Sequence, residues 1–152
     1  MQDPESIACW QRLDERITTS GRLTPADVDR LAALGVSQVV NLALAESPGA
    51  LEGEAEMLAA RGIRYTHIPV PFGAPEETHF AAFREAIEDS DEPVHVHCIM
   101  NWRVSAFFYR YHRAKGMDET AARALMERQW SPETSSNADA PTWARFITEG
   151  SQ

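Results

Sequence analysis

The sequence has few cysteines and no long apolar run, and both shortages restrict the kind of protein it encodes. Its 152 residues include two cysteines, Cys9 and Cys98, far apart in the chain. A structural disulfide is therefore not expected, and a reducing compartment fits better. No stretch approaches the roughly 18 apolar residues of a membrane span. The acidic and polar start Met1–Ser6 does not resemble a signal peptide. These absences predict a cytoplasmic protein with no membrane partner.

Basic residues are also too few to balance the acidic ones. Fourteen Lys and Arg stand against 23 Asp and Glu, which gives a net charge of −9. This balance argues against nucleic acid or anionic membranes as partners, although a local positive site remains compatible with it. No two His or Cys residues have metal-ligand spacing with a third partner, so we expect neither a metal nor a cofactor. The paired His95 and His97 are interpreted as structural.

Helical and strand patterns alternate along the chain, and the length suits one domain over residues 1–152. The start at residues 6–18 predicts a short strand pair or an irregular segment, and residues 131–139 predict a loop. Strands are predicted at residues 39–44, 63–70 and 94–98, and helices at 24–35, 51–62, 76–89, 104–115, after Asp118 and at 140–148. This alternation predicts an α/β domain with a mostly parallel central sheet flanked by helices. Ligands of such sheets bind beyond the carboxyl ends of the strands.

The most informative stretch runs from Val94 to Tyr111. Val94, Val96 and Cys98 alternate with two histidines, which predicts a short strand. From Val104 the apolar spacing changes to that of one helix face. A strand, a tight turn and a helix N-terminus bring backbone N–H groups together, and these bind anions. A thiol at this point is stabilised as its reactive thiolate.

The residues His97-Cys98 followed by Arg103 and Ser105 resemble the signature of the protein tyrosine and dual-specificity phosphatase superfamily. The resemblance implies a phosphatase-like fold and a phospho-cysteine mechanism, with Cys98 as the nucleophile and Arg103 as the clamp on phosphate. It extends less strongly to residues 64–70, which resemble the strand before the general-acid loop. Residues 22–25 and 39–42 resemble the opening of a bacterial branch of these phosphatases.

The spacing departs from that signature, because Arg103 follows Cys98 after four residues where the family has five. In one alignment the loop is one residue shorter and Arg103 still grips phosphate. In the other the loop has its full length, and Asn101 replaces a Gly while Val104 takes the Arg position. Asn tolerates a left-handed turn conformation better than most residues, which favours the second alignment. The sequence alone leaves both alignments open.

Further roles follow from the resemblance. The loop residues Ile99, Met100, Asn101 and Trp102 are predicted to bind the oxyanion, and Ser105 to assist the departing thiolate. A general acid is expected upstream of the nucleophile, but residues 71–75 contain no Asp. Glu76, and next to it Glu77, are the nearest carboxylates, and Glu76 is predicted to protonate the leaving group.

The leading prediction is a cysteine-dependent phosphatase that hydrolyses a phosphate monoester. Its expected partner is a phosphorylated substrate or a small oxyanion such as phosphate or sulfate. The alternative is a catalytically impaired phosphatase-like domain that only binds such a ligand. A third interpretation assigns the activated thiol of Cys98 to redox or sulfur-transfer chemistry of the rhodanese kind, although the order of elements favours the phosphatase.

Overall fold

A five-stranded sheet forms the centre of the computed structural model, which describes residues 2–149. The strand order is β1-β2-β5-β3-β4, with β1 antiparallel to β2 and the other three pairings parallel. The strands are β1 (Gln11–Arg12), β2 (Ile17–Ser20), β3 (Gln38–Asn41), β4 (Arg64–His67) and β5 (Val94–His97). The predicted α/β class with a mostly parallel sheet is confirmed.

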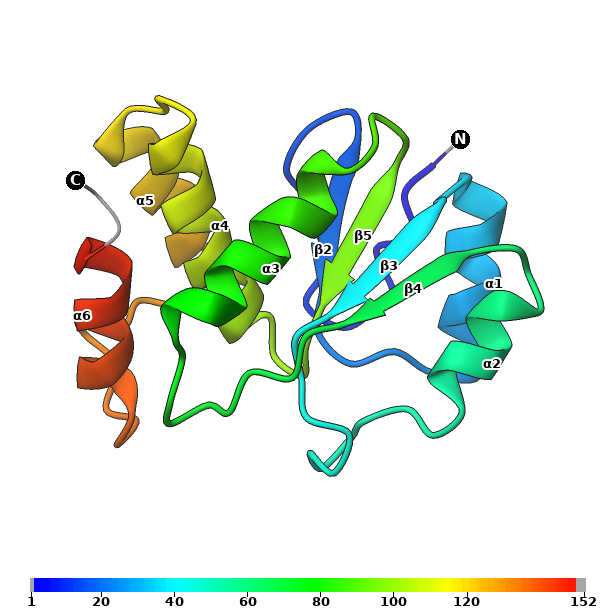
Figure 1. Ribbon diagram of the computed structural model, residues 1–152, viewed down its shortest axis with the longest axis horizontal. Coiled ribbons are helices and arrows are strands. Elements are labelled where there is room, and N and C mark those ends of the chain that lie inside the picture. Colours follow the sequence, from blue (N-terminus) through cyan, green and yellow to red (C-terminus); the bar gives the residue numbers. More distant parts are fainter. Residues whose placement is uncertain (1, 150–152) are drawn as a thin grey trace.

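Helices cover both faces of this sheet. They are α1 (Pro25–Leu34), α2 (Glu54–Ala59), α3 (Glu77–Glu88), α4 (Trp102–Ala114), α5 (Glu119–Glu127) and α6 (Ala140–Glu149). Helices α1 and α2 lie on one side, and α3 to α6 lie on the other (Figure 1). Among residues 2–149, no helix is both long enough and apolar enough to cross a membrane.

The two faces of the sheet bury two separate apolar clusters. Neighbouring residues of a strand point to opposite faces, and accordingly Val39 packs with α1 and α2 while Val40 packs with α3 to α6. Along β5, Val94, Val96 and Cys98 belong to the larger cluster, as the alternation predicted. That cluster contains most of the aromatic side chains, including Phe83, Phe107 and Trp143.

Local sequence signals account for the first helix. Thr24 Oγ1 accepts a hydrogen bond from the Asp27 backbone N–H, and the Asp27 carboxylate accepts one from the Thr24 backbone N–H, which is a capping box. Pro25 occupies the first turn and Gly35 ends the helix at a φ of 95°. The helix α3 is also close to its prediction, whereas the strand expected over residues 63–70 is regular only at Arg64–His67.

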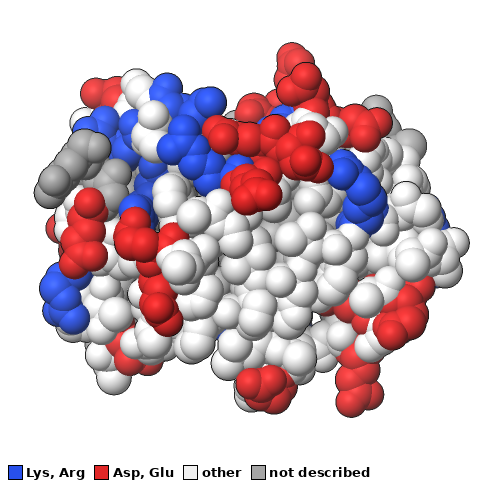
Figure 2. Space-filling view, viewed as in Figure 1, with Lys and Arg blue, Asp and Glu red and all other residues white. Residues whose placement is uncertain are grey.

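The surface reflects the acidic composition. Figure 2 shows Asp and Glu side chains at several places on the face seen in Figure 1, with Lys and Arg in fewer patches. The net charge of the whole sequence is −9. Any attraction for an anion must therefore come from a local arrangement of donors and not from the overall charge.

Candidate active site

Cys98 follows β5 directly and lies 1% exposed at the carboxyl end of the sheet. Its backbone N–H points to the carbonyl of Ser20, at the end of β2, with an N–O distance of 3.4 Å. The residues 98–101 form a loop, and α4 begins at Trp102. The strand, turn and helix predicted around Cys98 are therefore present, although the helix begins two residues earlier than the apolar spacing indicated.

Asn101 gives this loop its shape. Its φ of 66° and ψ of 7° are left-handed, a conformation that Asn adopts more readily than other non-Gly residues. Its side-chain Nδ2 donates to the Cys9 carbonyl at 2.9 Å and to Thr19 Oγ1 at 3.1 Å. The loop is thus anchored to the segment before β1 and to β2.

Arg103 lies in the same pocket as Cys98 and does not extend into solvent. Its side chain is 7% exposed, and Nη1 donates to the carbonyl of Val70 at 2.9 Å. The next residue, Val104, is fully buried in the large cluster and has no polar group to offer. The structure therefore combines the left-handed Asn101 of one alignment with the pocket-lining Arg103 of the other.

The pocket around Cys98 has a volume of about 200 Å³ and a mixed apolar and cationic wall. The residues that line it are Phe72, Cys98, Ile99, Met100, Trp102, Arg103 and Asn137. Met100 is 47% exposed, and Trp102 stacks on Trp130 with ring centroids 4.8 Å apart. Of the five residues 99–103 that were predicted to contact the oxyanion, four line this pocket. The fifth, Asn101, does not line it and instead anchors the loop to Cys9 and Thr19.

The two candidates for the general acid, Glu76 and Glu77, lie outside the Cys98 pocket. Glu76 is the N-cap of α3, where its backbone N–H donates to His79 Nδ1 at 3.0 Å and its backbone carbonyl accepts the His79 N–H at 3.0 Å. Glu77 forms two hydrogen bonds with Arg110, at 2.6 and 2.9 Å, and this guanidinium lowers the pKa of the Glu77 carboxyl. Neither carboxylate lines the pocket of Cys98. The role of Glu76 as proton donor therefore stays a prediction that its position does not favour.

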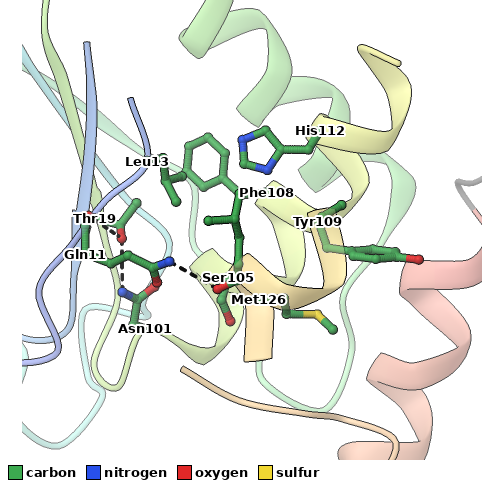
Figure 3. Close-up of a pocket in the computed structure, with 11 residues that line it drawn as sticks. Gln11, Leu13, Thr19, Asn101, Ser105, Phe108, Tyr109, His112 and Met126 are labelled. Atoms are coloured by element: carbon green, nitrogen blue, oxygen red, sulfur yellow. Dashed lines mark hydrogen bonds between the residues drawn. The ribbon is translucent and has the colours of Figure 1, made fainter. Parts of the chain in front are cut away.

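Ser105 faces a second, closed space behind the loop. Figure 3 shows its side chain there with Gln11, Thr19 and Asn101. The space is about 10 Å³, and the Asn101 Oδ1 beside it is buried without a hydrogen-bond partner among the described residues. Such a volume suits one water molecule. Ser105 Oγ donates to the Trp102 carbonyl at 3.0 Å and does not reach the Cys98 pocket.

The histidines on the other face of β5 are internal supports. His97 Nδ1 lies 3.1 Å from the Cys98 carbonyl, and its Nε2 lies 2.6 Å from Glu54 Oε2, with both side chains buried. His95 lies between Thr18 and Ser20, and burial holds its pKa well below the usual value. No three His, Cys, Asp or Glu side chains within residues 2–149 are grouped to hold a metal ion.

Comparison with known proteins identifies the family. Residues 10–112 match the family described as "Beta-lactamase hydrolase-like protein, phosphatase-like domain". The chain belongs to this family. A Beta-lactamase hydrolase-like protein of Agrobacterium fabrum is 27% identical over 153 residues, which covers 88% of this chain and 36% of that protein. The chain thus spans little more than a third of the length of this relative.

Solved structures share the fold of this family member. A putative phosphatase from Shewanella putrefaciens is 26% identical and has a TM-score of 0.85, over 98% of this chain and 95% of that one. TpbA of P. aeruginosa, solved in complex with pTyr, is 18% identical with a TM-score of 0.74, over 99% and 92% of the two chains. The phosphatase-like family and fold that the resemblance implied are therefore confirmed.

Three residues that contribute to the site were not predicted from the sequence. Gly21 packs so closely on the loop that a Cβ there would lie 2.4 Å from the Ile99 carbonyl oxygen. Glu54 is buried against His97, and a signal existed, since it lies four residues before Leu58 on the apolar face of α2. Asn137 lines the pocket from a segment 36 residues beyond Asn101, and no local pattern indicates that approach.

Proposed function

We propose that this phosphatase-like domain hydrolyses phosphate monoesters through a covalent phospho-cysteine. One observation carries the proposal: Cys98 and Arg103 line the same pocket, at the point where β5 ends and α4 begins. The thiol has the N-terminal end of a 13-residue helix next to it, which favours negative charge. The family and the fold of its relatives agree with this chemistry.

In the first step, the Cys98 thiolate attacks phosphorus, so that an S–P bond forms while the P–O bond to the leaving group breaks. The backbone N–H groups of residues 99–103 and the Arg103 guanidinium stabilise the three equatorial oxygens. The guanidinium has donors left for this task, since one of them binds the Val70 carbonyl. In the second step, water attacks phosphorus and the S–P bond breaks, which releases phosphate and the thiolate.

The wall of the pocket suggests the shape of the substrate. Phe72 and Trp102 flank the thiol and the guanidinium, and exposed Met100 extends this apolar rim. TpbA binds pTyr with the same fold at low identity. We infer that a phosphate group fills the polar base of the pocket while an apolar part of the ester contacts the rim. The reducing, cytoplasmic location inferred from the two cysteines stays a prediction.

The decisive experiment measures hydrolysis of 4-nitrophenyl phosphate between pH 5 and 8 with a chelator present. We expect turnover by the wild type that falls at least about 1,000-fold in Cys98→Ser, because the hydroxyl is not ionised at these pH values. Cys9→Ser is the matched control, since that thiol is exposed and does not line the pocket. A wild type no faster than Cys98→Ser, in protein shown to be folded, would contradict the proposal.

A second candidate is a domain that binds an oxyanion without turnover. The observation that favours it is the lack of a carboxylate among the residues that line the pocket, which removes an obvious proton donor. Under this hypothesis phosphate or vanadate binds to wild type and to Cys98→Ser with similar affinity, measured by calorimetry, and no ester is hydrolysed. Hydrolysis that depends on Cys98 excludes it.

A further inference from the structure

The proposed reaction needs a proton donor, because an alkoxide or phenoxide is a poor leaving group at neutral pH. The resemblance places this donor on the loop after β4, where residues 71–75 have no acid. Of the two glutamates at the start of α3, Glu77 is paired with Arg110 and exposed Glu76 is the N-cap residue of the helix, and neither lines the pocket. The missing group must therefore come from another part of the chain.

The carboxylate of Asp139 lies against this loop. A Cβ placed on Gly73 would be 3.3 Å from Asp139 Oδ1 and 3.7 Å from Oδ2. Gly73 follows Phe72, which lines the Cys98 pocket. A carboxylate from the segment between α5 and α6 thus occupies the space that a side chain at residue 73 would fill. The loop lacks an acid of its own but has one beside it.

Two further contacts hold Asp139 beside the pocket. Its backbone N–H donates to the side-chain Oδ1 of Asn137 at 2.8 Å, and Asn137 itself lines the pocket. On the other side, Trp143 Nε1 donates to the Phe72 carbonyl at 2.6 Å, which ties the first turn of α6 to the loop after β4. The two segments together form one wall of the pocket.

Asp139 is also not engaged as a capping side chain. It precedes α6, and its backbone carbonyl accepts the N–H of Trp143 at 3.3 Å. Within residues 2–149, however, its carboxylate accepts no hydrogen bond, whereas that of Asp118, the cap of α5, accepts the N–H of Ala121 at 3.2 Å. The half-buried Asp139 carboxylate is thus unpaired. It does not itself line the pocket, but it lies against Gly73 and follows Asn137 closely in the chain, beside two residues of the pocket wall, Phe72 and Asn137.

We propose that Asp139 is the general acid of this site, a role that rests on the proposed phosphatase function. In the first step, protonated Asp139 transfers its proton to the ester oxygen as the P–O bond breaks, and it is left as a carboxylate. In the second step that carboxylate takes a proton from the attacking water as the new O–P bond forms and the S–P bond breaks. The acid is regenerated and the charges balance.

The test compares three substitutions that each replace a carboxylate by its amide near a helix N-terminus: Asp139→Asn, Glu76→Gln and Asp118→Asn. Asn caps a helix as well as Asp does, so the fold is expected to persist. The substrates are aryl phosphates that range from 2,4-dinitrophenyl to phenyl phosphate. General-acid catalysis matters most for the most basic leaving group.

For Asp139→Asn we expect kcat/KM to fall less than about threefold with 2,4-dinitrophenyl phosphate and at least about 100-fold with phenyl phosphate. Glu76→Gln and Asp118→Asn should keep the wild-type dependence on the leaving group. Inorganic phosphate should inhibit all four proteins equally, because the oxyanion contacts are unchanged. Should Asp139→Asn fold poorly, Asp139→Ser removes the same ionisable group with a smaller side chain and is expected to give the same selective loss.

Three results would overturn the inference. The first is a wild-type dependence on the leaving group in Asp139→Asn while turnover still depends on Cys98. This result would reject Asp139 as the general acid and would leave the proposed phosphatase function intact. The second is the selective loss in Glu76→Gln, which would restore the acid predicted from the sequence. The third is the absence of wild-type turnover with every ester, which rejects the phosphatase proposal and this inference together.

Discussion

The loop of residues 98–101 separates two hollow spaces that differ in nearly every respect. The space in front holds Cys98 and Arg103, has about 200 Å³ and meets solvent beside exposed Met100. The space behind has about 10 Å³, lies between β1, β2 and α4, and contains Ser105 (Figure 3). The first is lined by the thiol and the guanidinium of the proposed reaction, whereas beside the second Asn101 attaches the loop to Cys9 and to β2.

The difference between the two spaces suggests that residues on one side of the loop carry out the reaction, while residues on the other side hold the loop in place. Substitutions in the Cys98 pocket should affect turnover strongly and stability weakly, because the proposed reaction takes place there. Substitutions around the small space that contains Ser105 should mainly affect stability. They should affect turnover only if they displace the loop of residues 98–101. Four substitutions, taken from the largest expected effect to the smallest, test this division.

Arg103→Lys should reduce kcat/KM for an aryl phosphate by about 100- to 1,000-fold. Lys keeps the charge but cannot form two parallel hydrogen bonds with phosphate, and a lost transition-state donor costs about that factor. Thermal unfolding should change little, since Lys still reaches toward the Val70 carbonyl. Steady-state kinetics and a melting curve check this, and a loss below about fivefold would exclude Arg103 from the clamp.

Gly21→Ala should reduce kcat/KM by about 10- to 100-fold, because the new Cβ would lie 2.4 Å from the Ile99 carbonyl oxygen and the loop must shift. Overpacking of this kind also destabilises by about 1–3 kcal/mol. Gly35→Ala is the control, since its φ of 95° strains an alanine far from the loop. Equal activity of the two variants would show that close packing at Gly21 is unimportant.

Asn101→Ala should lower the free energy of unfolding by about 2 kcal/mol and kcat/KM by about tenfold. Two donated hydrogen bonds are lost, and alanine is strained at a φ of 66°. Asn101→Gly removes the same hydrogen bonds without the strain, so the difference between the variants, measured by urea unfolding, reports the strain. A fully stable alanine variant would contradict the anchoring role.

Ser105→Ala should have the smallest effect, with kcat changed by less than about twofold. Its hydroxyl donates within its own helix and does not face Cys98. If Ser105 instead assists the departing thiolate, as the resemblance implies, breakdown of the phospho-cysteine slows and a pre-steady-state burst of phenol appears. Stopped-flow measurement of 4-nitrophenol release distinguishes the two outcomes.

Local patterns predicted much of this molecule. The alternation at Val94, Val96 and Cys98 placed a strand, and the apolar spacing from Val104 placed a helix, so the position of Cys98 at a strand end followed. The preference of Asn for left-handed turns identified Asn101. These signals are carried by neighbouring residues, and tertiary contacts did not overrule them.

The general acid could not be predicted from local sequence patterns. Glu76 was selected because it is near the loop in sequence, yet it is the N-cap residue of α3 and does not line the pocket. Asp139 belongs to a polar stretch that predicted only a loop, and it reaches Gly73 because Trp143 ties α6 to the Phe72 carbonyl. Proximity across 66 residues leaves no periodic pattern in either segment.

The sequence by itself determined the alternation of strands and helices after residue 24 and the place of Cys98 at a strand end, and it favoured a left-handed turn at Asn101. Only the tertiary structure decided that Arg103 lies in the pocket while Val104 joins the core. It also decided that Asn137, from a distant segment, completes the wall and that Asp139 of the same segment lies against Gly73. The physical reason is that backbone propensity acts over a few neighbouring residues. Side-chain placement in a pocket depends instead on how all the helices pack on the sheet.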